Sequence, residues 1–340
     1  MTTPTSHTAG NTSARWLVTG GAGFIGSHIV ALLAQRGKAV RVLEREKAGT
    51  SHLPDGVEVL RGDITRLDDA ESAVEGCEVV IHCAANPNLW ARDAGVFERV
   101  NHQGTRRMLE AASEAKVKRF VHVSSEAVLA GPADEQGLID ESAERSLEEM
   151  AGPYSRSKWL AERAVRAFQE AGKLPAAMIA VPTVPVGPGD RNRTPPTRLI
   201  EAFLDQRLPA VLAADLPLID VRDAAAGLVA VADRGEAGER YLVAGENWST
   251  HLLLQAIGEL TGQSVPRWGP PYPLALASSH LAQGFRRIVG GRPLGTVEGV
   301  KLTRKRLRFD DSRCRQTLRL HPRPVAVAVH DAVKWLDPSA

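Results

Sequence analysis

Short apolar segments alternate with longer amphipathic segments along the first 181 residues of the chain. The apolar segments have the length and composition of buried strands, while the segments between them repeat apolar residues every three or four positions, as helices do. This alternation predicts right-handed β-α-β connections and a parallel sheet covered by helices on both faces, an α/β fold of the doubly wound Rossmann type. The expected strands are Trp16–Thr19, Ala39–Leu43, Val57–Leu60, Val79–His82, Arg119–Val123 and Ala177–Val181.

The pattern becomes less regular after Pro182, where proline-rich loops interrupt it. We predict a dinucleotide-binding Rossmann domain over residues 15–181 and a smaller, mainly substrate-binding region over 182–340, with segments around 217–245 returning to the sheet. Residues 1–14 are polar and lack an apolar core, so they predict a mobile tail rather than a signal peptide. The second region is expected to hold strands at Pro217–Val221 and Tyr241–Val243 and helices at Pro196–Leu204, Arg222–Asp233, His251–Thr261, Pro273–Val289 and Pro324–Leu336.

A glycine-rich turn joins the first strand to the first helix. Gly20, Gly23 and Gly26 are three positions apart and precede an amphipathic helix at Phe24–Gln35. In dinucleotide-binding proteins the first glycine permits the tight turn, the second lets the pyrophosphate approach the backbone, and the third lets helix and strand pack closely. The helix N-terminus offers unpaired N–H groups and a positive dipole end to a phosphate. We therefore predict a dinucleotide site here.

The end of the second strand bears on the choice of cofactor. An acidic residue about 20 positions after the glycine turn can accept a hydrogen bond from the ribose 2′-hydroxyl and repels a 2′-phosphate. Glu44 stands at this place, and Arg45, which follows it, can pair with a 2′-phosphate. The pair favours NAD and leaves NADP as the alternative.

A second group of chemically active residues lies downstream. Tyr154 and Lys158 are four residues apart at the start of a predicted helix, which places them on one helix face. A nearby ammonium favours the phenolate, so we expect Lys158 to lower the pKa of Tyr154 and to fit it for general acid/base work. Ser125 follows the strand Arg119–Val123 and is placed to donate a hydrogen bond to a substrate carbonyl.

These motifs together resemble the extended short-chain dehydrogenase/reductase family, of the NAD-dependent epimerase/dehydratase type. The likeness covers nearly all of residues 15–337 and extends, less specifically, to the branch of hopanoid-associated sugar epimerases and dihydroflavonol-reductase-like proteins. It is carried by Thr19–Gly26, Gly62-Asp63-Ile64, His82–Ala85, Asn101-x-x-Gly104-Thr105, Ser124-Ser125, Tyr154-x-x-x-Lys158 and Gly187–Asp190.

The resemblance implies the roles of further residues. Asp63 and Ile64 would face the adenine, Ala84 and Ala85 would line the dinucleotide, and Lys158 would hold the nicotinamide ribose. Ser125 and Tyr154 would contact the reacting oxygen, and two helices would pair in a homodimer. The full set assigned to cofactor binding is Gly20, Gly23, Phe24, Ile25, Gly26, Glu44, Arg45, Asp63, Ile64, Ala84, Ala85, Tyr154, Lys158 and Pro182.

Departures from the family pattern narrow the chemistry. Sugar-nucleotide dehydratases of the family carry Thr-Asp-Glu where this chain has Ser125-Glu126-Ala127, so elimination is disfavoured. Sugar-nucleotide epimerases carry an arginine and an asparagine near positions 181 and 184, where this chain has valines. We therefore predict a small, less polar substrate and an alcohol–ketone oxidoreductase, with a sugar epimerase as the alternative and a non-catalytic dinucleotide sensor as the third.

The candidate substrate contacts come from the segments after the fourth, fifth and sixth predicted strands. Trp90, Val184 and Val186 are proposed as pocket walls, although Trp90 fits a buried core position equally well. Glu126 can be interpreted as a substrate contact, but a solvated loop residue is favoured. His82, within an apolar strand, is interpreted as a hydrogen-bonded core residue rather than a base.

Composition sets limits on partners and location. The 340 residues have a formal net charge of +2, which gives no reason to expect nucleic acid or an anionic membrane as partner. Three cysteines without paired spacing favour a cytoplasmic location, no apolar run predicts a membrane span, and no metal-ligand spacing occurs. The segment Pro273–Val289 is either a lid or an interfacial helix, and the basic run at 301–308 is interpreted as a solvated face.

Overall fold

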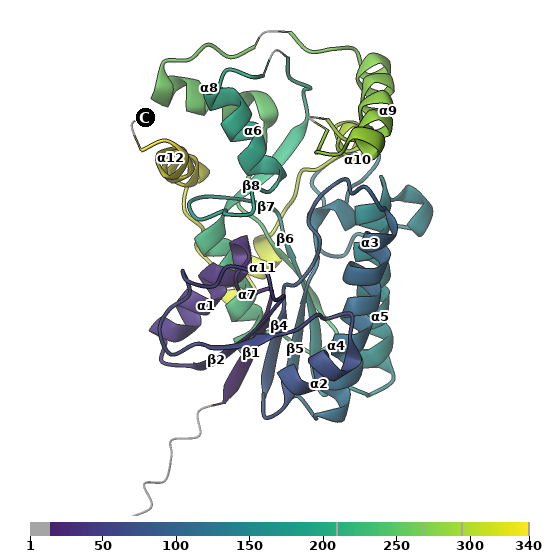
Figure 1. Ribbon diagram of the computed structural model, residues 1–340, viewed down its shortest axis with the longest axis vertical. Helices are drawn as coiled ribbons and strands as arrows, with labels where there is room; N and C mark the ends of the chain where they lie inside the picture. Colours follow the sequence, from purple (N-terminus) through teal and green to yellow (C-terminus); the bar gives the residue numbers. More distant parts are fainter. Residues whose placement is uncertain (1–13, 209, 267, 294, 339–340) are drawn as a thin grey trace, which may run out of the picture.

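A seven-stranded parallel sheet forms the larger part of the protein, seen in a computed structural model that describes residues 14–208, 210–266, 268–293 and 295–338 (Figure 1). The strand order is β3-β2-β1-β4-β5-β6-β9, so the order reverses between β1 and β4. The confirmed fold is a doubly wound Rossmann sheet. Its strands are β1 (Arg15–Thr19), β2 (Ala39–Glu44), β3 (Glu58–Arg61), β4 (Val79–His82), β5 (Arg119–Val123), β6 (Ala177–Pro182) and β9 (Arg240–Val243).

The strand register brings the functional residues to one edge of this sheet. Thr19 is opposite both Leu43 and His82, and His82 is opposite His122 on the next strand. The carboxyl ends of β1, β4 and β5 therefore lie side by side. In open α/β sheets, ligands bind outside these ends, at the point where the strand order reverses.

Helices cover both faces of the large sheet (Figure 1). α1 (Phe24–Gln35) and α7 (Val221–Arg234) pack together on one face. The opposite face carries α2 (Leu67–Val74), α4 (Gly104–Glu114) and α5 (Pro153–Glu170), which contact one another in sequence order. Each face has its own hydrophobic core, so the central strands are buried on both sides.

The C-terminal region adds a second, smaller layer above the carboxyl edge (Figure 1). Its three-stranded sheet has the order β10-β8-β7, with β8 parallel to β7 and antiparallel to β10. A third hydrophobic core joins this sheet to three helices. The elements are β7 (Val184–Val186), β8 (Asp215–Asp220), β10 (Glu246–Ser249), α6 (Pro195–Leu204), α8 (Thr250–Thr261) and α12 (Val325–Leu336).

Segments of the C-terminal half return to the large sheet in part. β9 is its last strand and α7 covers it, whereas β8 pairs only in the small sheet. The remaining helices are α3 (Gly95–Phe97), α9 (Tyr272–Val289), α10 (Val297–Leu302) and α11 (Ser312–Leu318), with a π-helical turn at Glu98–Gln103. Of the predicted N-terminal tail, only Ala14 lies within the described residues. None of the helices that the structure describes is long and apolar enough to cross a membrane.

Candidate active site

The glycine turn after β1 has the geometry of a dinucleotide cradle. Gly20 has φ +68°, and a Cβ there would lie 2.9 Å from the Cα of Ala84 on the neighbouring strand end. A Cβ on Gly26 would lie 2.1 Å from the Gly20 carbonyl oxygen, so helix and turn touch only because both residues are glycines. α1 begins at Phe24 without a side-chain cap or an acidic residue in its first turn. Its free N–H groups fit a pyrophosphate.

Glu44 and Arg45, at the end of β2, have different surroundings: the first is buried and the second is exposed. The Glu44 carboxylate is 8% exposed and accepts a hydrogen bond from the Ala22 N–H at 2.7 Å, directly at the glycine turn. Burial raises the pKa of Glu44, while backbone hydrogen bonds from Ala22 and Arg45 act against the rise. Arg45 is exposed, and its carbonyl accepts a hydrogen bond from Arg61. Glu44 thus occupies the position from which a carboxylate reaches a ribose hydroxyl.

The other residues assigned to the cofactor line the same edge. Ala84 is half-buried and donates its N–H to the Thr19 hydroxyl at 3.1 Å, and Asp63 accepts two hydrogen bonds from Thr65. Ile64 is only 6% exposed and packs against Gly104. The side chains of Phe24 and Pro182 are buried too, whereas Ile25 and Ala85 are half-buried.

Tyr154 stands in the first turn of α5, beside the end of β5. Its half-buried ring meets the edge of Phe97 with centroids 6.4 Å apart. Burial raises the pKa of Tyr154, the carboxylate of Glu126 raises it further, and a hydrogen bond with Ser125 acts in the opposite direction. Ser125 and Tyr154 are therefore brought together, as the sequence predicts, by the carboxyl end of β5 and the N-terminus of α5.

Lys158 lies one turn along the same helix and is 3% exposed. Its ammonium donates a hydrogen bond to the Val123 carbonyl at 2.5 Å, and burial lowers its pKa to about 8, with Glu162 acting against that fall. The expectation that Lys158 lowers the pKa of Tyr154 is wrong for this arrangement. The pKa of the phenol is raised, and the groups that act on it are Glu126, Ser125 and Glu298, while the lysine ammonium is hydrogen-bonded to the strand end.

Glu126 is not the solvated loop residue that the sequence favours. Its carboxylate accepts a hydrogen bond from Ser125 Oγ at 2.9 Å, and burial raises its pKa. The reason is local: Ser125 caps a short 3₁₀ turn at Glu126–Val128, which folds the glutamate back toward the serine and tyrosine. The candidate catalytic group thus contains a half-buried carboxyl as well as the two hydroxyls.

A buried polar chain connects the glycine turn with α5. His82 Nδ1 is 2.7 Å from the Thr19 hydroxyl and its Nε2 is 3.1 Å from the Thr105 hydroxyl, which confirms a hydrogen-bonded core histidine. Burial lowers the pKa of His82 to about 3. Thr105 donates to the Asn101 carbonyl, Asn101 donates to Ser157 Oγ at 3.0 Å, and Ser157 donates to the Tyr154 carbonyl.

The roles of Asn101 and Ser157 in this chain are not predicted from the sequence. The family motif Asn101-x-x-Gly104-Thr105 singles out Asn101, but the sequence does not show which residues its side chain contacts. In the structure Asn101 lies in the π-helical turn Glu98–Gln103, a type of distortion frequently found at functional sites. The turn aims the Asn101 amide at Ser157 and at the backbone of Asn86.

Glu298 completes the N-terminus of α5 from a distant part of the chain. Its carboxylate accepts hydrogen bonds from the backbone N–H groups of Tyr154 at 3.0 Å and Ser155 at 2.8 Å, and from the Ser155 hydroxyl. The side chain is 2% exposed, and its close approach needs Gly152, where a Cβ would meet it at 2.5 Å. A carboxylate at a helix N-terminus satisfies free donors and is stabilised by the helix dipole. Sequence reasoning missed this residue.

Residues 16–244 of the chain match the NAD dependent epimerase/dehydratase family. The chain belongs to this family. It is 32% identical over 326 residues to a putative dihydroflavonol 4-reductase of Synechocystis sp. (strain ATCC 27184 / PCC 6803 / Kazusa), with 94% of each chain covered.

Two further likenesses extend over almost the full chain. Sterol demethylase protein B of Methylococcus capsulatus is 32% identical over 323 residues, which cover 94% of this chain and 97% of that protein. The crystal structure of gox2253 matches with a TM-score of 0.84 at 30% identity, covering 96% of this chain and 98% of that one. As an epimerase/dehydratase family member, the protein is an NAD(P)-dependent enzyme, which confirms the predicted class and cofactor type.

The proposed pocket walls of this family member differ in accessibility. Trp90 is half-buried, and its indole Nε1 is buried with no hydrogen-bond partner among the described residues. Val184 is half-buried at the edge of the small sheet, whereas Val186 is 2% exposed and packs in the core below it. Val181 is fully buried in the core of the large sheet.

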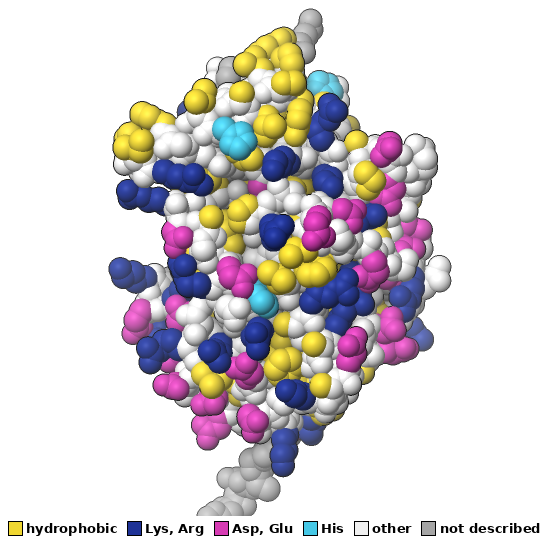
Figure 2. All heavy atoms as spheres, turned by 90° about the vertical axis from the view of Figure 1, so that its right-hand side faces the viewer, with side chains coloured by type: hydrophobic (Ala, Val, Ile, Leu, Met, Phe, Trp, Pro, Cys, Tyr) yellow, Lys and Arg dark blue, Asp and Glu magenta, His cyan; other side chains and the backbone are white. Residues whose placement is uncertain are grey.

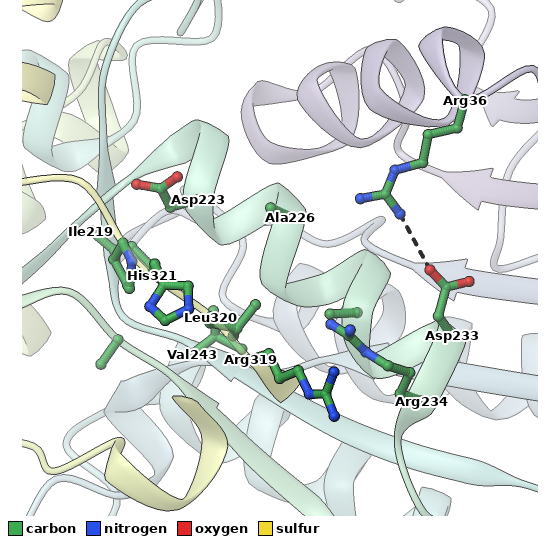
Figure 3. A pocket seen from close by; sticks show the side chains of 13 residues that line it. Arg36, Ile219, Asp223, Ala226, Asp233, Arg234, Val243, Arg319, Leu320 and His321 are labelled. Carbon is green, nitrogen blue, oxygen red and sulfur yellow. Dashed lines mark hydrogen bonds and ion pairs between the residues drawn. The ribbon is translucent and has the colours of Figure 1, made fainter. Parts of the chain in front are cut away.

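A separate cavity of ≈ 310 Å³ lies against α7 and residues 319–322 (Figure 3). Arg36 and Asp233 form an ion pair at 3.3 Å beside it. Its lining includes neither Ser125, Tyr154 nor Lys158, so this cavity is not the candidate active site. In the part of the chain that the structure describes, no group of three His, Cys, Asp or Glu side chains is arranged to hold a metal ion.

Proposed function

We propose that this epimerase/dehydratase family member is an oxidoreductase that interconverts a secondary alcohol and a ketone. The observation that carries the proposal is the pairing of Ser125 with Tyr154 at the carboxyl end of β5, next to the glycine turn. Ser125, whose hydroxyl donates to the Glu126 carboxylate in this structure, would turn that hydrogen bond to the substrate oxygen and orient it. Tyr154 donates the proton to that oxygen during reduction and accepts it during oxidation. When bound, the nicotinamide supplies or accepts the hydride.

Lys158 and Glu298 support the reaction without moving the proton themselves. Lys158 holds its ammonium at the strand end, where the nicotinamide ribose is expected, and Glu298 fixes the helix turn that carries Tyr154. Holding the phenol in place supports the reaction rate, because a misplaced general acid transfers its proton less efficiently.

A mainly apolar substrate fits the surroundings of Tyr154 best. The ring of Phe97 borders the phenol, with the two ring centroids 6.4 Å apart. The valines at 181 and 184 provide no charge for a buried diphosphate, and burying such a charge without a partner costs several kcal/mol. One similar protein is called a sterol demethylase protein, which is consistent with an apolar ring system.

The experiment is a two-panel screen with the purified protein and either NAD or NADH. We expect turnover with a hydrophobic ketone or alcohol, with one NADH consumed or formed per product. Micromolar binding of nucleotide sugars with no binding of hydrophobic ketones would contradict the apolar pocket. The family description keeps a sugar epimerase as the second candidate. An epimerase would retain its cofactor and release no net NADH when its substrate is added.

We further propose that NAD is the preferred cofactor, because the Glu44 carboxylate lies at the glycine turn and Arg45 lies outside it. The expected result is a higher kcat/KM with NADH than with NADPH, and a reduced preference in Glu44→Gln, which removes the charge that repels a 2′-phosphate. Glu46→Gln, at an exposed position just after β2 and outside the residues assigned to the cofactor, is the matched control and should leave the cofactor preference unchanged. A tenfold advantage of NADPH in the unmodified protein would refute the assignment.

We also propose that the protein is a homodimer and that it is located in the cytoplasm. The family resemblance implies a homodimer built on α4 and α5. The three cysteines, Cys77, Cys83 and Cys314, are all free thiols, and free thiols are typical of a reducing compartment such as the cytoplasm.

A further inference from the structure

α9 presents its large apolar side chains to solvent. Leu274, Leu281, Phe285 and Ile288 are 57%, 76%, 59% and 82% exposed, and their spacing of seven, four and three residues places them on one helix face. The opposite face, which packs on the protein, buries only small residues such as Ala275 and Ser279. This is the reverse of a surface helix whose apolar stripe faces the core. Val289, the last residue of α9, and Trp268, four residues before the helix begins, are both 61% exposed as well.

The charges around this apolar stripe have one sign. Residues 260–297 contain no Asp or Glu, whereas Arg286, Arg287 and Arg292 lie at the C-terminal end of α9 or just beyond it. Lys301 and Arg304 are exposed on and after α10, which packs on α9, and the Arg304 guanidinium lies 5.0 Å from the centroid of the Tyr272 ring. None of these five side chains forms an ion pair within the described residues. The overall charge of +2 conceals this local excess.

The space-filling view agrees with this description (Figure 2). On the face that carries α9, hydrophobic side chains gather in the upper part, and Lys and Arg side chains lie next to them. Monomeric proteins rarely expose a contiguous apolar surface without a partner, so the combination points to a ligand for the surface.

We propose that the α9 surface, defined as Trp268, Leu274, Leu281, Phe285, Ile288 and Val289 with the adjacent arginines, binds an anionic lipid bilayer. The helix would lie in the plane of the interface, with its apolar face among the acyl chains and its arginines at the lipid phosphates. Each basic residue near an anionic membrane contributes favourable electrostatic energy. A second copy of the chain fits less well, because two such surfaces would bring arginines against arginines.

The position of this surface links membrane binding to the active site without depending on the proposed reaction. α9 packs on α10, and α10 carries Glu298, whose carboxylate holds the N–H groups of Tyr154 and Ser155. Membrane binding would therefore place the catalytic helix two packed elements away from the lipid. The benefit of such a position rests on the proposed function, because an apolar substrate would be concentrated in the bilayer.

Co-sedimentation of the full chain with lipid vesicles tests the proposal. We expect at least about tenfold tighter binding to vesicles that contain phosphatidylglycerol than to pure phosphatidylcholine vesicles, and weaker binding at high salt. The variant Leu281→Ser/Phe285→Ser/Ile288→Ser should lose binding by a similar factor, and Arg286→Glu/Arg287→Glu should lose the preference for anionic lipid. Leu138→Ser and Leu252→Ser, at exposed apolar positions outside α9, are the matched controls and should bind as the unmodified protein does.

Three results would overturn the proposal. The first is equal vesicle binding by the unmodified protein and the triple serine variant. The second is a lack of binding to both vesicle types. The third is self-association that the triple variant abolishes while lipid binding is absent, which would assign the surface to a second copy. Thermal melting and NADH binding of each variant show that it is folded, and neither readout depends on the identity of the substrate.

Discussion

At the scale of single residues, the environment of the Tyr154 phenol determines what it can do. Tyr154→Phe removes the proton donor assigned to the reacting oxygen, so we expect kcat to fall at least about a hundredfold. NADH binding should change little, because the phenol hydroxyl is expected to make only a small part of the contact with the dinucleotide. Steady-state kinetics and cofactor titration measure the two effects. Residual activity above a tenth of the unmodified rate would rule out Tyr154 as general acid/base.

A companion variant tests the electrostatics of the same phenol. The carboxylate of Glu126 raises the pKa of Tyr154, so Glu126→Gln should lower it. Ketone reduction needs the protonated phenol and is lost as the pH rises through its pKa. The alkaline loss of reduction activity should therefore move to lower pH in Glu126→Gln. An unchanged pH profile would show that the two groups are not coupled.

Lys158 gives a prediction for stability. Burial lowers the pKa of this lysine from 10.5 to about 8, so between these pH values the unfolded chain binds more protons than the folded one. Stability from this group is reduced below pH 8 and recovers as the pH rises toward 10.5. The free energy of unfolding of the unmodified protein, relative to Lys158→Met, should therefore increase over this window by up to about 3 kcal/mol.

Urea denaturation of both proteins from pH 7 to pH 10 measures this difference, and groups common to both cancel. A stability difference that stays constant across the range would show that the lysine is not perturbed. The same substitution should weaken cofactor binding, because Lys158 is assigned to the ribose.

At the scale of elements, the N-terminus of α5 depends on Glu298. Glu298→Ala leaves the N–H groups of Tyr154 and Ser155 buried without an acceptor, so we expect a loss of about 2 kcal/mol in unfolding free energy. We also expect kcat to fall more than KM rises, because the substitution moves Tyr154 rather than the substrate surface. Glu298→Gln should retain more stability than Glu298→Ala.

The readout that separates positioning from simple stability is the pH profile. The Glu298 carboxylate contributes to the raised pKa of Tyr154, so Glu298→Gln should also move the alkaline loss of reduction to lower pH. Glu259→Gln, at an exposed position in α8, is the matched control and should change neither quantity. A profile identical to that of the unmodified protein would contradict this role for Glu298.

The elements that the sequence predicts well are those with strong local patterns. The strands before Gly20 and Ser125 are apolar runs that end in a turn residue, and the helix that begins near Tyr154 has a clear period. The strand Val184–Val186 has only three residues and contains Pro185, and Glu246–Ser249 is polar, so neither carries a strand signal. Both become strands because they pair with β8.

The site residues likewise could be predicted only where a sequence pattern marks them. Tyr154, Lys158 and Ser125 could be predicted because their spacing is local and matches a family pattern. Glu298 could not, because a glutamate in a basic segment gives no indication that it meets a helix N-terminus far earlier in the chain. The hydrogen bond of Lys158 to the Val123 carbonyl also depends on tertiary packing, which a spacing rule does not contain.

At the scale of the whole molecule, the expected assembly is a homodimer in which α4 and α5 pair across a two-fold axis. The outward positions of these helices are largely charged, with Arg107 paired to Glu110 and Arg163 paired to Glu144. No large hydrophobic side chain is highly exposed on the described residues of either helix. A dimer on this face should therefore rely on polar contacts and weaken with salt.

Light scattering at micromolar concentration should give the mass of two chains at low salt. The triple serine variant of α9 should have the same mass, since its substitutions lie on a different element. A strictly monomeric mass at all salt concentrations would contradict the dimer.

The large sequence separation between Glu298 and Tyr154 affects when the active site can form during synthesis. During synthesis, Tyr154 leaves the ribosome 144 residues before the carboxylate that accepts its N–H. A nascent chain can close the glycine turn and the first five strands of the large sheet, yet its catalytic helix begins without an acceptor for its first donors. The helix turn that carries Tyr154 is thus fully held only after residue 298 has been made, so a chain that ends before it should turn over substrate more slowly than the complete one.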